Sequence, residues 1–126
     1  MYTGIAQEGE PKPVRWVGTS LRDLRSFPNS VKSDIGHALF TAQRGKTDPA
    51  AKPLKGFGSA SVLEIVASHN GNAWRAVYTV RFHDAVYVLH AFQKKSTKGI
   101  ATPAREIKLI KQRLAEAERD YSERQN

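Results

Sequence analysis

The chain has 126 residues and a formal net charge of +8, and its length is that of one small domain with a core of its own. It contains no cysteine, which excludes disulfides and thiolate metal sites. It has neither an apolar run that could cross a membrane nor the residue order of a secretion signal, so we expect a soluble cytoplasmic protein.

Positive charge is concentrated in the middle of the chain. Residues 52–113 contain eleven lysines and arginines against three acidic residues, whereas residues 1–51 contain seven against five and residues 114–126 two against four. Such clustering favours nucleic acid or an acidic protein as the partner. An ordinary solvated basic surface is the simpler alternative.

The predicted elements begin after a polar, flexible lead-in over residues 1–12. Val14, Trp16 and Val17 indicate a short first strand. Ser20 is a candidate cap for the short helix that follows this strand.

A second helix is expected between Pro28 and Gly45, which suit the first turn and the end of a helix. Its apolar residues recur at helical spacing: Val31, Ile35, Ala38, Leu39 and Ala42. Residues 46–61 contain prolines and glycines and are expected to form a loop.

Three antiparallel strands are predicted next, over residues 62–67, 74–82 and 85–92. Asn70-Gly71 is a strong turn signal between the first two strands, and His83-Asp84 is the expected tip between the second and the third.

The last helix is predicted to start at Thr102 and Pro103, a cap residue and a first-turn proline. One of its sides is an apolar seam of Ile107, Ile110, Leu114, Ala117 and Tyr121, and its polar side begins with Arg105, Lys108, Lys111 and Arg113. No repeat or second domain is apparent in the sequence. Residues 13–121 are therefore expected to form one domain, with residues 122–126 as a tail.

This order of elements predicts an α+β fold, in which a small antiparallel sheet has helices packed on one face and a C-terminal helix. The other face of the sheet is expected to be open, at least in part, and to hold the functional site.

Symmetric turns assign each strand residue to one of the two faces, and the turn at His83-Asp84 places Thr79 opposite Val88. The predicted core face holds Leu63, Ile65, Ala67, Trp74, Ala76, Tyr78, Phe82, Ala85, Tyr87 and Leu89. The predicted open face holds Glu64, Arg75, Arg81, His90 and Phe92, with Lys94 just beyond the strand end.

The side chains on the open face suit a phosphodiester. Arg75 can bind two phosphate oxygens at once, and the ring of Phe92 can stack on a base. Glu64 and His90 can transfer protons. Simpler roles stay open: Arg75 pairs with Glu64 alone, His90 is a partly buried strand residue, and Phe92 packs under the last helix.

Other chemistries find less support in the sequence. The histidines are scattered without partners at metal-ligand spacing, and no phosphate-binding glycine loop or nucleophile elbow is present, so we expect neither a metal nor a cofactor. RNA can be cleaved without a metal, because its own 2′-hydroxyl is the nucleophile. The protein then needs to align that hydroxyl, accept its proton and stabilise the developing charge.

Several motifs, taken in order, closely resemble the phage-derived, HigB-like branch of the RelE/ParE toxin superfamily. They are KPVRWVGTSLRDLRSFP, AKPLKGFG, VLEIV, RAVYTVRF, VYVLHAFQKKS and KGIATPAREIKLIKQRL, and the likeness covers about residues 12–121. The resemblance implies a RelE-like fold and the toxin of a type II toxin–antitoxin pair. It further implies cleavage of mRNA on the ribosome, and neutralisation by a helix-turn-helix antitoxin.

The resemblance also suggests catalytic residues. Arg75 falls where RelE-like toxins have a strand arginine that acts on the scissile phosphate, and Lys94 and Lys95 fall near their second cation. The strand VLEIV has Glu64 where RelE has lysines. Since some HigB toxins use histidine and acidic groups, Glu64 or His90 is the expected general base or acid.

The RNA or ribosomal RNA backbone is expected to contact Lys52, Lys55, Arg81 and Lys98, and an RNA base is expected to stack on Phe92. A solvated surface is the alternative for the lysines. The C-terminal tyrosine of RelE has no clear counterpart here, because Tyr121 lies on the apolar seam of the last helix.

A second function is compatible with the same fold. ParE-like relatives inhibit gyrase by binding, without cleaving RNA. An inactive prophage remnant is a third alternative.

Overall fold

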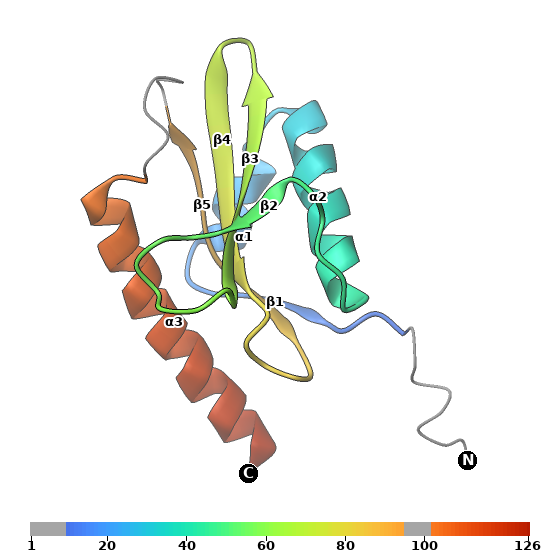
Figure 1. Ribbon diagram of the computed structural model, residues 1–126, viewed down its shortest axis with the longest axis vertical. Coiled ribbons are helices and arrows are strands. Elements are labelled where there is room, and N and C mark those ends of the chain that lie inside the picture. Colours follow the sequence, from blue (N-terminus) through green and yellow to red (C-terminus); the bar gives the residue numbers. More distant parts are fainter. Residues whose placement is uncertain (1–9, 95–101) are drawn as a thin grey trace.

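The computed structural model describes residues 10–94 and 102–126 (Figure 1). In chain order its elements are β1 (Val14–Trp16), α1 (Ser20–Arg25), α2 (Asn29–Gln43), β2 (Ala51–Pro53), β3 (Val62–His69), β4 (Asn72–Thr79), β5 (Val86–Lys94) and α3 (Ala104–Gln125). The strands form one sheet in the order β1-β5-β4-β3-β2. The predicted α+β class is therefore confirmed. Across the two described ranges, no helix has the length and apolar character needed to cross a bilayer.

The sheet is antiparallel except at β1, which pairs with β5 in parallel. The register of β3 and β4 is as predicted, with Glu64 opposite Val77. Asn70 and Gly71 form the connecting turn, and both have positive φ, 50° and 80°. An Asn-Gly pair is favoured in such a turn because both residues tolerate this conformation.

A β-bulge between β4 and β5 changes which residues face α3. Val77 lies opposite His90 as predicted, but Thr79 lies opposite Tyr87 instead of Val88. The bulge adds one extra residue to β5. Side chains before the bulge therefore point to the opposite face from the one that regular alternation predicts. The prediction of a shared core face is therefore wrong for four residues, which pack in the core beneath α3: Phe82, Ala85, Tyr87 and Leu89.

Each face of the sheet has a core of its own. The core against α1 and α2 includes Ile35, Leu39, Ile65, Tyr78 and Val88. The core against α3 includes Val62, Val77, Leu89, Ile110 and Leu114.

The second face is therefore covered by α3, and the expectation of an open face is wrong along this helix (Figure 1). The apolar seam of a long helix must be buried, and this face of the sheet supplies the matching surface. The cover is incomplete, because Val66 on β3, opposite Arg75 on β4, is 42 % exposed.

Tertiary contacts also change the predicted roles of several residues. Part of the expected loop over residues 46–61 forms the edge strand β2. Ser20 and Thr102 are not helix caps, because the cap positions belong to Thr19 and Pro103, and neither of those makes a side-chain capping bond. Arg113, expected on the solvated side of the last helix, is buried.

Candidate functional site

Charged and polar side chains lie between the sheet and the first turns of α3. Strands β3, β4 and β5 contribute Glu64, Arg75 and His90 to this layer. The layer consists of two groups, which we call the Arg75 cluster (Glu64, Arg75 and Thr102) and the His90 network (Thr19, His90, Glu106 and Arg113).

The Arg75 cluster is a buried ion pair with a threonine beside it. Arg75 Nη1 lies 2.9 Å from Glu64 Oε1, and the side chains are 5 % and 12 % exposed. The Thr102 hydroxyl donates to Glu64 Oε2 at 2.6 Å, and Arg75 Nη1 also lies 3.4 Å from this hydroxyl. Each carboxylate oxygen of Glu64 thus accepts a hydrogen bond from a different element of the fold.

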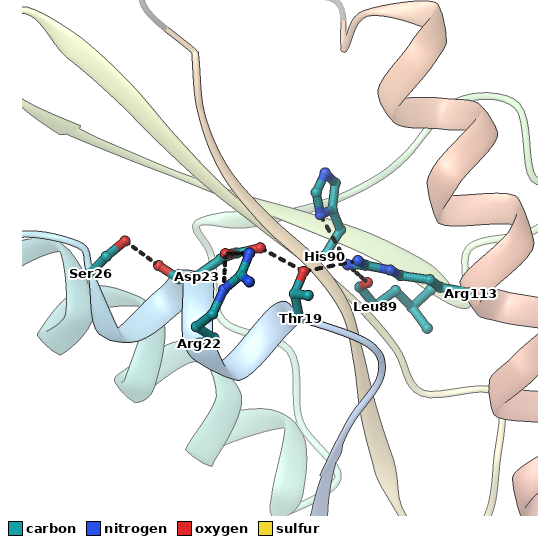
Figure 2. A network of polar contacts seen from close by, with 7 residues as sticks. All are labelled: Thr19, Arg22, Asp23, Ser26, Leu89, His90 and Arg113. Atoms are coloured by element: carbon teal, nitrogen blue, oxygen red, sulfur yellow. Dashed lines mark hydrogen bonds and ion pairs between the residues drawn. The ribbon is translucent and has the colours of Figure 1, made fainter.

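The His90 network favours one tautomer of the imidazole ring. Arg113 Nη1 lies 3.3 Å from His90 Nδ1 and donates to the Leu89 carbonyl at 3.0 Å (Figure 2). A guanidinium has no acceptor atom, so Nδ1 must be the unprotonated ring nitrogen. The proton of the neutral ring is therefore on Nε2, where it donates to Glu106 Oε1 at 2.7 Å.

The network continues into α1 through the other end of the guanidinium. Arg113 Nη2 donates to the Thr19 hydroxyl at 3.0 Å, and this hydroxyl donates to Asp23 at 2.8 Å (Figure 2). Burial raises the pKa of Asp23, but hydrogen bonds from Thr19 and Arg22 outweigh burial and hold that pKa below its ordinary value. A chain of polar contacts therefore joins α1, β5 and α3.

The lysines predicted after the last strand and the predicted stacking residue Phe92 lie near or beyond the end of β5 in the sequence. Lys94 is half-buried at the end of β5, and the predicted positions Lys95 and Lys98 lie outside the described residues. Phe92 is buried, and its ring stacks on His90 with 4.8 Å between the ring centroids. In this structure the Phe92 ring thus packs against protein, as in the simpler interpretation of the sequence.

The other predicted RNA contacts lie at two separate places. Lys52 and Lys55 are exposed, and Lys52 is opposite Glu64 on the edge strand β2. Arg81, expected on the same face as the catalytic residues, lies beyond the end of β4 and binds Glu118 of α3 at 2.6 Å. Along the axis of α3, Glu118 lies about 18 Å from Glu106 of the His90 network. Arg81 is therefore not part of the polar layer that contains Arg75 and His90.

Sequence reasoning missed three members of the site: Thr102, Glu106 and Arg113. Thr102 was assigned to helix capping. Glu106 and Arg113 lie four residues before and three residues after Ile110, so they share its buried side of the helix. The position of Glu106 and Arg113 on the apolar side of the last helix was the sequence signal that could have identified them.

A separate polar group lines a cavity of about 370 Å³ near the C-terminal half of α3, away from every predicted site residue. The Tyr87 hydroxyl donates to Asp120 at 2.6 Å and accepts from Arg15 at 3.0 Å. Burial and the hydrogen bond to Asp120 raise the pKa of Tyr87. These contacts attach the helix to β5 and β1.

The fold places the chain in the RelE-like class of α+β proteins. The isolated E. coli RelE toxin matches it with a TM-score of 0.52 and 19 % identity, over 70 % of this chain and 87 % of that chain. A mutant of the E. coli toxin RelE in the free state gives a TM-score of 0.48 and 16 % identity, over 70 % and 85 %. The toxin–antitoxin complex RelBE2 from Mycobacterium tuberculosis gives 0.45 and 21 %, over 67 % and 92 %. At these identities the likeness is one of fold.

The sequence itself defines the family. The model of the family described as "Phage derived protein Gp49-like (DUF891)" matches residues 22–115. The chain therefore belongs to this family of RelE/HigB-like toxins, and the resemblance inferred from the motifs is confirmed. No curated protein matches the chain significantly.

Proposed function

We propose that this RelE-family toxin is the toxin of a type II toxin–antitoxin pair and that it cleaves mRNA on the ribosome without a metal. The observation that carries the proposal is the grouping of Arg75, Glu64 and His90 on one face of a RelE-like sheet. One cation and two groups that transfer protons are what attack by a 2′-hydroxyl requires.

Each residue has a role in the proposed reaction. Arg75 stabilises the charge that develops on the phosphate oxygens, an effect of about 10²–10³-fold for one donor. One of Glu64 and His90, in its unprotonated form, accepts the proton of the 2′-hydroxyl, and the other, in its protonated form, gives a proton to the leaving 5′-oxygen, which contributes about 10²–10⁴-fold. Lys94 and Lys95 bind the phosphate.

The proposal extends to binding and partners. The RNA or ribosomal RNA is held by Lys52, Lys55, Arg81 and Lys98, with Phe92 as a stacking surface for a base. A helix-turn-helix antitoxin encoded beside the toxin neutralises it. The proposed RNA contacts of Lys52 and Lys55 are supported by their exposure next to β3, the strand that carries Glu64.

Induced expression in a bacterial host tests the reaction. The wild-type protein is expected to arrest growth and to produce new 5′ ends within translated messages, and co-expression of the neighbouring gene is expected to restore growth. Arg75→Ala should abolish both effects, whereas Arg25→Ala, an exposed arginine on α1, should change neither.

Two results would contradict the proposal. Growth arrest with intact messages and an SOS response would identify a ParE-like inhibitor of gyrase. Cleavage of messages by a correctly folded Arg75→Ala protein would remove Arg75 from the active site.

A further inference from the structure

The residues assigned to catalysis lie beneath a helix. The Arg75 side chain is 5 % exposed and the His90 side chain is 8 % exposed. A phosphate must come within hydrogen-bond distance of a guanidinium to be bound by it. RNA therefore cannot reach these two side chains while Thr102 contacts Arg75 and Glu106 contacts His90 as they do here.

The proton-transfer groups are engaged as well. Both carboxylate oxygens of Glu64 accept hydrogen bonds, one from Arg75 and one from Thr102. Both ring nitrogens of His90 are occupied, by Glu106 and by Arg113. In this arrangement His90 can accept the proton of a 2′-hydroxyl only if one of its contacts breaks. Each oxygen of Glu64 keeps a second lone pair, but the Glu64 side chain is 12 % exposed and lies beneath Thr102.

The contacts that hold the cover are polar at its start and apolar further along. Thr102 and Glu106 contact the strands through hydrogen bonds of 2.6 and 2.7 Å. Ile107 is partly buried against the core beneath α3, and the fully buried apolar residues of the helix begin at Ile110, about one turn after Glu106. The first turn can therefore leave the sheet while the core beneath the rest of the helix stays intact.

A bound RNA can replace the hydrogen bonds that are lost when the cover opens. When Thr102 leaves, a phosphate can replace the carboxylate as the anion that Arg75 binds, and the Glu64 oxygen that Thr102 covered becomes accessible to the 2′-hydroxyl. A polar cover of this kind exchanges one set of charge-assisted hydrogen bonds for another, whereas an apolar cover would expose hydrophobic surface.

We propose that Thr102 and the first turns of α3 form an autoinhibitory cover, in which the Thr102–Glu64 and Glu106–His90 contacts keep the toxin closed and binding of RNA opens it. This inference rests on the proposed function, because it concerns access to the same residues. The apparent affinity for RNA is then the intrinsic affinity multiplied by the fraction of molecules that are open.

The test compares Thr102→Val, which loses the hydroxyl but keeps its shape, with Thr102→Ser, which keeps the hydroxyl. Thr41→Val is the matched control, because Thr41 bonds to the His37 carbonyl on α2, on the opposite side of the sheet. The probe is a 70S ribosome carrying a message with 2′-O-methyl groups, which prevent cleavage. Thermal unfolding checks that each variant folds.

Thr102→Val is expected to bind the programmed ribosomes about 3- to 10-fold more tightly, the range for one net hydrogen bond that no longer has to break. Hydrogen exchange of the first turns of α3 should rise in the free variant, and an unblocked message should be cleaved faster. Thr102→Ser and Thr41→Val should behave as the wild type does.

Two outcomes distinguish a failure of the proposed cover from a failure of the proposed function. If all four proteins bind and cleave equally, or Thr102→Val binds more weakly, the cover is refuted and the proposed function survives. If none of them binds programmed ribosomes or cleaves message, the proposed function fails and the cover fails with it.

Discussion

Glu64 and Arg75 occupy diagonal positions on β3 and β4, and their side chains form an ion pair of 2.9 Å beneath the residue that precedes α3. The pair is buried, so each charge gains compensation from the other in a region of low dielectric constant. Breaking such a pair leaves an uncompensated charge in a region of low dielectric constant.

Replacement of Glu64 by glutamine should therefore lower the free energy of unfolding by about 3–5 kcal/mol, as for other buried pairs from which one partner is removed. Glu118→Gln breaks the ion pair with Arg81 at a site where the two side chains are 48 % and 33 % exposed. Its effect should be about 0–1 kcal/mol. Urea denaturation measures both, and equal effects would contradict the burial of Arg75.

The backbone at Gly18 and the guanidinium of Arg113 are in close contact. A Cβ atom at Gly18 would lie 2.9 Å from Arg113 Nε, and Gly18 has a φ of 56°. Arg113 cannot move aside freely, because its nitrogens bond to Leu89 and Thr19. Gly18→Ala should thus cost the left-handed strain of about 1–2 kcal/mol and about 1 kcal/mol more for crowding.

Gly71 provides the matched control for this prediction. Its φ is 80°, and nothing lies within 4 Å of a Cβ built there, so Gly71→Ala should cost the backbone strain alone. Placing Gly18→Ala in an Arg113→Ala background should remove the excess over Gly71→Ala. An excess that persists in the double mutant would place the crowding elsewhere.

Tyr78 predicts how stability changes in alkaline solution. Burial raises the pKa of Tyr78 to about 12, and among the residues that the structure describes its hydroxyl has no hydrogen-bond partner. Between pH 10 and that value the unfolded chain loses this proton while the folded chain keeps it, so stability falls as the pH rises. The decrease should reach roughly 2–3 kcal/mol.

Tyr78→Phe should remove this part of the alkaline decrease and leave stability at pH 7 equal or higher, because no hydrogen bond is removed. Tyr87→Phe should lower stability at pH 7, since the Tyr87 hydroxyl bonds to Asp120 and Arg15. Urea titrations at a series of pH values compare the two variants. An unchanged alkaline slope in Tyr78→Phe would show that this hydroxyl ionises normally.

Two exposed lysines, Lys52 on the edge strand β2 and Lys55 just after it, predict how RNA binding depends on salt. If Lys52 and Lys55 contact phosphates, replacing both by alanine should reduce the slope of log K against log salt by about 0.7–0.9 for each lysine that binds a phosphate. Binding to programmed ribosomes is measured at several KCl concentrations. Arg25→Ala, an exposed change on α1 across the sheet, should leave the slope unchanged. A slope that stays constant in the lysine variant would exclude this role for the two lysines.

Local patterns in the sequence were sufficient for much of the fold. The β3–β4 register follows from the Asn70-Gly71 turn and from strict alternation on either side of it, since both signals act over a few residues. The same alternation put Glu64, Arg75 and His90 on one face. The motifs were sufficient to place the chain in its family, which the match over residues 22–115 confirms.

Long-range packing decided what the sequence did not. The side of the sheet that α3 covers depends on how its apolar seam fits Val77 and Leu89, and the bulge in β5 helps to form that surface. Thr102 bonds to Glu64 across 38 positions of the chain, a contact to which no local pattern points. The sequence by itself thus determined that Glu64, Arg75 and His90 share a face. The tertiary structure alone decided that a helix lies over this face, because helix placement is set by complementary surfaces far apart in the chain.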